Sequence, residues 1–62
     1  MNEINRTIMR ARRYLSLGNE VAYEDEMIQC IKESHDVDAE YIIKAGKRDG
    51  YSFRQFGLKV KP

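Results

Sequence analysis

The single cysteine, Cys30, sets the first limit on how this chain can fold. No internal disulfide can form, and beside the one histidine, His35, there is no second cysteine to begin a zinc site. A chain of 62 residues buries only about 60% of the surface that its unfolded form exposes, so its core is thin. We therefore expect one small domain over residues 1–62, without metal or cofactor, for which a homodimer would supplement the core.

The segment 3–17 is predicted to form the first helix. Its apolar residues recur at helical spacing and are Ile4, Ile8, Ala11 and Leu15. The opposite side is basic and contains Arg6, Arg10 and Arg13. This pattern is typical of an amphipathic helix that covers a core with one face. Gly18 ends the helix, because glycine readily adopts the left-handed conformation that closes a helix C-terminus.

A second helix is predicted over residues 23–35. Met27 and Ile31 lie on its inner side, at the spacing of one helical turn. Its outer side is strongly polar and carries Asp25, Glu26, Gln29 and Glu33. His35, at the end of this helix, is expected to be partly buried. The second helix therefore presents one apolar side and one acidic side.

A third helix is predicted over residues 39–47, with Asp38 as its N-cap. Val37 precedes it and is expected to be an apolar plug between the second and third helices. Four apolar residues have a spacing close to that of a helix-turn-helix pair, and they are Ile31, Val37, Ile42 and Ala45. The two helices are thus expected to bury a small shared core.

The stretch KAGKRDGYSF, residues 44–53, allows two interpretations. Either the third helix ends here and a strand follows, or the stretch forms a β-hairpin with Asp49 and Gly50 at its tip. The helix is favoured, because Ala45 and Gly46 are poor strand residues.

Apolar and aromatic residues alternate after this stretch, so residues 51–60 are predicted to form a small C-terminal strand. Its expected partner is a short strand over residues 20–22, where the sequence is partly β-branched. The predicted fold class is therefore α+β, with three short helices, a helix-turn-helix-like pair and this small sheet.

The net charge of +1 conceals a strong segregation along the chain. Residues 1–19 hold four arginines and one glutamate, for a net charge of +3. Residues 20–43 hold one lysine and eight carboxylates, for a net charge of −7. Residues 44–62 hold six cations and one aspartate, for a net charge of +5. Such asymmetry points to charged partners.

The basic third helix and C-terminal segment form a candidate surface for double-stranded DNA. Clustered cations neutralise phosphates and give a salt-dependent affinity. The predicted contact residues are Tyr41, Lys44, Lys47, Arg48, Arg54, Lys59 and Lys61. Tyr41 and Lys44 are the candidates for contact with base edges. The simpler alternative is that each of these side chains is only part of a solvated face.

The acidic second helix supports an alternative function. Its outer residues would repel DNA and could dock a basic patch on another protein, as in a small phage-type adaptor or inhibitor of a host enzyme. This candidate partner surface consists of Asp25, Glu26, Gln29 and Glu33. The arginines of the first helix either extend the DNA surface or face Glu24, Glu26 or Glu33 of the second helix. The second interpretation, in which they form surface pairs, is favoured.

The run from Glu24 to Phe56 resembles the small helix-turn-helix repeat of the intron-encoded nuclease repeat, or nuclease-associated modular domain, family. The similarity lies in VDAEYI, which opens the third predicted helix, and in GYSF, which opens the predicted strand. It covers about half of the chain and leaves the first helix without a counterpart. The resemblance implies a unit that binds DNA without performing chemistry. Glu40 departs from what a DNA-reading helix prefers.

No glycine-rich phosphate loop, metal-ligand cluster or catalytic constellation occurs in the sequence. The first residues lack the apolar run of a signal peptide, and no stretch approaches the roughly 18 apolar residues of a membrane span. We therefore expect a non-enzymatic cytoplasmic protein, with a helix-turn-helix-like regulator of transcription as the leading hypothesis.

Overall fold

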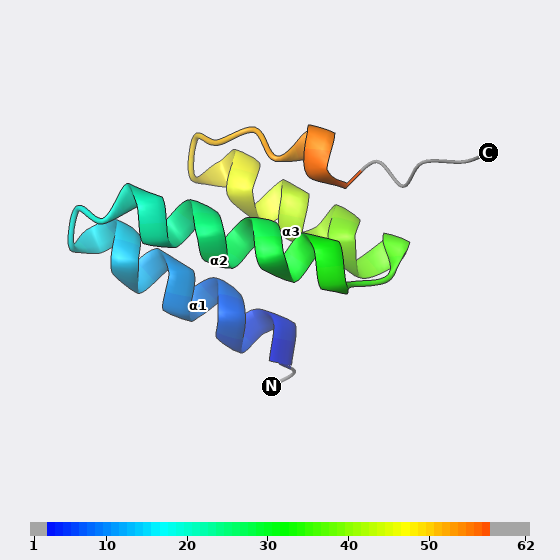
Figure 1. The fold of residues 1–62 in the computed structure, drawn as a ribbon, viewed down its shortest axis with the longest axis horizontal. Helices are drawn as coiled ribbons and strands as arrows, with labels where there is room; N and C mark the ends of the chain where they lie inside the picture. The colour runs from blue at the N-terminus through cyan, green and yellow to red at the C-terminus, as the bar shows by residue number, and fades with distance from the viewer. Residues whose placement is uncertain (1–2, 58–62) are drawn as a thin grey trace.

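The computed structural model describes residues 3–57 as three α-helices followed by one turn of 3-10 helix. The elements are α1 (Glu3–Ser16), α2 (Glu20–Glu33), α3 (Asp36–Arg48) and η1 (Arg54–Phe56). Figure 1 shows that successive helices run in alternating directions, with α2 between α1 and α3 in this view. After α3 the chain turns back, and η1 lies alongside α3.

The fold of the described residues is all-α, so the α+β prediction is wrong. Residues 20–22 form the first turn of α2, and residues 51–57 form coil and η1, without any strand in the range 3–57. The remainder of the predicted strand, residues 58–60, lies outside the described residues. The β-hairpin interpretation is wrong as well, because α3 continues to Arg48.

Asn19 explains why α2 begins three residues earlier than predicted. Its side-chain oxygen accepts a hydrogen bond from the backbone N–H of Ala22 at 3.1 Å, which satisfies one of the free donors at a helix start. Just before it, Gly18 has a φ of +80°, in the left-handed region that glycine tolerates. The prediction that Gly18 ends the first helix is therefore confirmed.

The α2–α3 connection also differs from the prediction. It is formed by Ser34 and His35, and α3 begins at Asp36 with His35 as its N-cap residue. Asp38 is therefore inside the first turn and is not the N-cap. Val37 is 80% exposed, so it cannot be the apolar plug of a helix-turn-helix core. His35 is likewise exposed, contrary to the expectation of partial burial.

The aromatic residues after α3 pack on the helices instead of extending into a sheet. Phe53 is buried, and a Cβ at Gly46 would overlap its ring. Tyr23 contacts both Tyr51 and Phe53, at ring-centroid distances of 4.8 and 5.9 Å. Gly46, two residues before the end of α3, therefore permits close packing of Phe53 and does not itself end the helix.

The core lies between the three helices and beneath Phe53. It consists of Ile8, Ala11, Tyr23, Met27, Ile31, Ala39, Ile42, Ala45 and Phe53. The predicted apolar stripe of α1 is confirmed, because Ile8 and Ala11 are buried while Ile4 and Leu15 pack against the core. The amphipathic period of α1 was thus sufficient to identify its buried face.

Candidate nucleic-acid interface

Helix α3 presents a basic outer face that includes Lys44, Lys47 and Arg48, all of which are exposed. Lys44 and Arg48 are one turn apart and line a groove between α3 and α1. Lys47 and Arg54 line a second depression, on the side of α3 that faces the C-terminal segment. Lys44, Lys47 and Arg48 therefore lie on the exposed face of α3, and Arg54 lies beside it.

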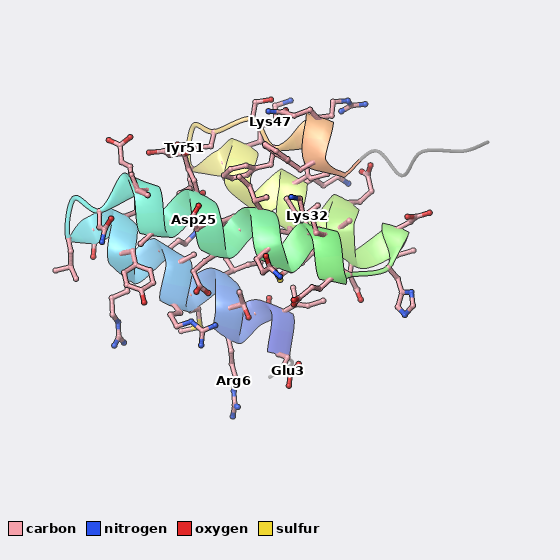
Figure 2. All side chains as sticks on the ribbon, in the orientation of Figure 1. Glu3, Arg6, Asp25, Lys32, Lys47 and Tyr51 are labelled. Atoms are coloured by element: carbon pink, nitrogen blue, oxygen red, sulfur yellow. The ribbon has the colours of Figure 1, made fainter. Side chains whose placement is uncertain are left out.

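The other two predicted contact residues, Lys59 and Lys61, lie outside the described residues. Figure 2 shows that Lys47 and Arg6 project from opposite edges of the molecule. The outer face of α1 is thus separate from the basic face of α3.

The groove between α1 and α3 has a volume of about 270 Å³. Ile8, Met9 and Ala45 supply its apolar surface. The remaining lining residues are polar or charged and are Asn5, Arg12, Tyr41, Lys44 and Arg48. The lining therefore combines an apolar surface with three cations and contains no carboxylate.

Tyr41 is held at the groove by its hydroxyl group. The hydroxyl donates a hydrogen bond to Oδ1 of Asn5 at 2.6 Å, which links α3 to α1. The tyrosine nevertheless remains 48% exposed, so its ring is accessible from solvent. Met9 is also well exposed, at 58%. These two side chains make the groove an aromatic and apolar surface open to solvent.

A partly buried ion pair links the end of α3 to α1, and a tyrosine of α2 joins it. Nε of Arg12 donates to both carboxylate oxygens of Asp49, at 3.1 and 2.9 Å, and its Nη2 donates to the carbonyl oxygen of Ala45 at 3.2 Å. The hydroxyl of Tyr23 donates to Oδ2 of Asp49 at 2.7 Å. The Asp49 side chain is only 16% exposed, and its charge is compensated by the Arg12 guanidinium and the Tyr23 hydroxyl.

Tyr23 is affected by this arrangement. Burial, followed by the hydrogen bond to the Asp49 carboxylate, raises the pKa of the Tyr23 hydroxyl well above its ordinary value. Arg12 acts in the opposite direction, because a nearby cation favours the tyrosinate. Tyr23 therefore remains neutral and serves as a hydrogen-bond donor.

The second depression, of about 160 Å³, lies between α3 and the C-terminal segment. Its walls include Ile43, Lys47, Arg54 and the rings of Tyr51 and Phe53. These two rings are stacked, with an interplanar angle of 4° and centroids 6.0 Å apart. The aromatic packing thus positions Arg54 on the same side of α3 as Lys47.

The acidic surface predicted on α2 is partly neutralised within the molecule. Nη2 of Arg10 lies 3.0 Å from a carboxylate oxygen of Glu26, which confirms the predicted pairing of α1 arginines with α2 carboxylates for this pair. Gln29 donates a hydrogen bond to Glu33 at 2.6 Å. Asp25 is exposed on the face of α2 seen in Figure 2.

Cys30 has the environment of a packing residue. It is half-buried against the core, and burial raises the pKa of its thiol, which disfavours the reactive thiolate. Ser34 donates a hydrogen bond to the carbonyl oxygen of Cys30 at 2.6 Å. Within the described part of the chain, no group of three or more His, Cys, Asp or Glu side chains is placed to hold a metal ion.

The α1 side of the groove was not predicted from the sequence. Asn5, Met9 and Arg12 follow one another at helical spacing beside the apolar stripe of α1, which is the signal that would have identified this third face. What could not be foreseen is that this face lies against α3, because that depends on how the helices pack.

Comparison with family models, with curated proteins and with solved structures finds no match. Among residues 3–57, none of the helices has the length and apolar content required to cross a membrane. The function is therefore inferred from the geometry of the chain itself.

Proposed function

We propose that this protein is a non-enzymatic nucleic-acid-binding protein that contacts the phosphate backbone of double-stranded DNA through the exposed face of α3. One observation carries the proposal. Lys44, Lys47 and Arg48 on α3, with Arg54 after it, have no ion pair with any carboxylate within residues 3–57. Their charge is thus available to phosphates.

The inward orientation of the Asp49 carboxylate supports the same proposal, whereas Glu40 does not. Asp49, the one acidic residue among residues 44–62, is turned inward and neutralised by Arg12. Glu40 is exposed one turn before Lys44, and it opposes phosphate binding. Changing Glu40 to Gln would therefore strengthen binding, by roughly fivefold at most for one unit charge near the interface.

Regulation of transcription in the cytoplasm is the role that we propose for such binding. The likeness to the nuclease-associated repeat contributes little to it, because that family has a strand where this chain has coil and η1. The proposal depends on the charges of α3 and not on a shared apolar core, from which Val37 is excluded by its exposure.

The proposal is tested by changing Lys44, Lys47 and Arg48 together to Ala and measuring the affinity for a mixed-sequence duplex over a range of salt concentrations. Loss of three phosphate contacts should weaken binding about 100-fold or more near 0.1 M salt, and lower the slope of log affinity against log salt by about 0.9 for each contact.

The matched control changes three cations on the outer side of α1, Arg6, Arg10 and Arg13, to Ala. It removes the same charge from another face, so the affinity should fall much less. Equal losses in the two triple variants would assign binding to net charge alone. Absence of binding by the unmodified protein to any duplex at low salt would refute the proposed function.

A further inference from the structure

The groove between α1 and α3 has features that phosphate binding does not require. A phosphate needs only cations and N–H donors, whereas this groove offers the apolar surfaces of Ile8, Met9 and Ala45 beside a tyrosine ring. Its volume of about 270 Å³ is at or below the lower end of the range for drug-sized ligands. It therefore has room for one flat ring.

Tyr41 is oriented for contact through its ring. Its hydroxyl is held by Asn5 at 2.6 Å, so the ring is fixed while about half of the residue remains exposed. Nucleobases stack on such aromatic side chains with little dependence on sequence, because every base has a π face. The thioether of Met9, at the same groove, is polarisable and adapts to flat partners.

Lys44 and Arg48 line the same groove and are separated by one turn of α3, a rise of about 6 Å. Cations in this position would contact the phosphates on either side of a base that occupies the groove. Arg12 contributes less, because its guanidinium is engaged by Asp49 and Ala45. The groove thus combines a stacking surface with cations that continue onto the outer face of α3.

We propose that the α1–α3 groove holds one unpaired nucleobase, stacked on Tyr41, while Lys44 and Arg48 contact the adjoining phosphates. This inference rests on the proposed function and refines it, since it makes a single-stranded end or a bulge in DNA the preferred ligand. An acidic peptide with one apolar side chain is the competing occupant. A nucleic acid is favoured because the cations extend beyond the groove to Lys47 and Arg54, as a long polyanion requires.

The experiment compares two DNA hairpins of the same sequence, one fully paired and one with a single unpaired 2-aminopurine in a 3′ overhang. Affinity is measured by anisotropy of a dye at the loop, and stacking is measured by the emission of 2-aminopurine. The unmodified protein should bind the overhang about tenfold more tightly, because stacking on one aromatic side chain contributes this much, and should quench its emission.

Two variants locate the effect. Tyr41→Leu should remove both the preference for the overhang and the quenching, whereas Tyr41→Phe, which keeps the ring, should retain the preference. Met9→Glu adds a carboxylate at an exposed position of the groove, so it should also remove the preference without unfolding the protein.

Each remaining outcome is decisive. Equal affinity for the two hairpins without quenching would overturn the nucleobase site but leave the proposed function standing. Failure to bind either hairpin would overturn both. A Tyr41→Leu variant that still prefers the overhang would also overturn the nucleobase site. Displacement of the overhang by a short Glu-rich peptide that contains leucine, at lower concentration than unlabelled overhang DNA, would assign the groove to a protein partner instead.

Discussion

Two arginines of α1 and two cations of α3 carry the same charge in different surroundings. Arg10 and Arg12 on α1 each form an ion pair, with Glu26 and Asp49 respectively. Lys44 and Arg48 on α3 have no such partner among residues 3–57. Arg10 and Arg12 thus link helices, whereas Lys44 and Arg48 are exposed and unpaired within the described range.

The two ion pairs of α1 also differ from each other. The Arg12–Asp49 pair has additional hydrogen bonds from Tyr23 and to Ala45, and the Asp49 side chain is 16% exposed. In the Arg10–Glu26 pair the arginine side chain is 60% exposed, so water competes for both groups. Whether a cation holds the fold together therefore depends on its burial and its partners. A count of charges along the chain gives neither.

The largest effect is expected from breaking the Arg12–Asp49 pair. Arg12→Met keeps much of the side-chain volume but leaves a mostly buried carboxylate without its cation, so it should lower the free energy of unfolding by about 1–3 kcal/mol. Lys44→Met, the matched change on α3, should alter it by less than about 0.5 kcal/mol. Urea unfolding followed by far-ultraviolet circular dichroism measures both.

Adding Asp49→Asn to each variant sharpens this comparison. With Arg12 already changed, loss of the carboxylate should cost much less than it does in the unmodified protein, because the two groups are coupled. Additive effects of Arg12→Met and Asp49→Asn would show that the pair does not contribute as a unit.

A smaller effect is expected at alkaline pH. The pKa of Tyr23 is raised in the folded protein, so its neutral hydroxyl contributes stability in full below the unfolded value of about 10. This contribution is lost as pH rises above 10, by up to about 1.4 kcal/mol per pH unit. Tyr23→Phe should lose less stability than the unmodified protein between pH 10 and 11 in urea titrations. Parallel losses in the two proteins would contradict this assignment.

The smallest effect is expected at the Arg10–Glu26 pair. Arg10→Met should lower the free energy of unfolding by about 0.2–1 kcal/mol at low salt, and the difference should shrink in 1 M NaCl, because salt screens exposed charges. A loss as large as that of Arg12→Met would remove the distinction between the two pairs. Chemical denaturation with urea, which leaves the ionic strength unchanged, is the suitable measurement.

Much of the helical architecture followed from the sequence, because helices depend on local signals. The period of apolar residues identified α1 and its buried face, and the glycine at position 18 identified its end. The start of α2 was also encoded locally, by Asn19 and the acidic residue after it, but this cap was overlooked in favour of the strand propensity of Val21.

The predicted strand failed for a reason that lies outside the segment itself. Alternation of aromatic residues indicates a strand only where another strand is available, and its expected partner is part of α2. The rings of Tyr51 and Phe53 instead pack against Tyr23 and over Gly46. Local pattern could not reveal this tertiary packing.

The candidate site was only partly accessible to sequence reasoning. Charge clustering selected Lys44, Lys47 and Arg48, whose side chains are exposed as expected. The groove beside them could not be predicted, because Met9 and Tyr41 are 32 positions apart and are brought together by the packing of α1 on α3.

The location of the Asp49 carboxylate has a consequence for how the molecule opens. This carboxylate links Arg12 in the C-terminal half of α1, Tyr23 in the first turn of α2 and the end of α3 at one pole of the bundle. His35, at the other pole, provides no side-chain cap for α3. Amide protons in the first turn of α3 should therefore exchange with deuterium faster than those around Tyr23. Local unfolding is therefore expected to begin at the end of the bundle where α2 and α3 are connected.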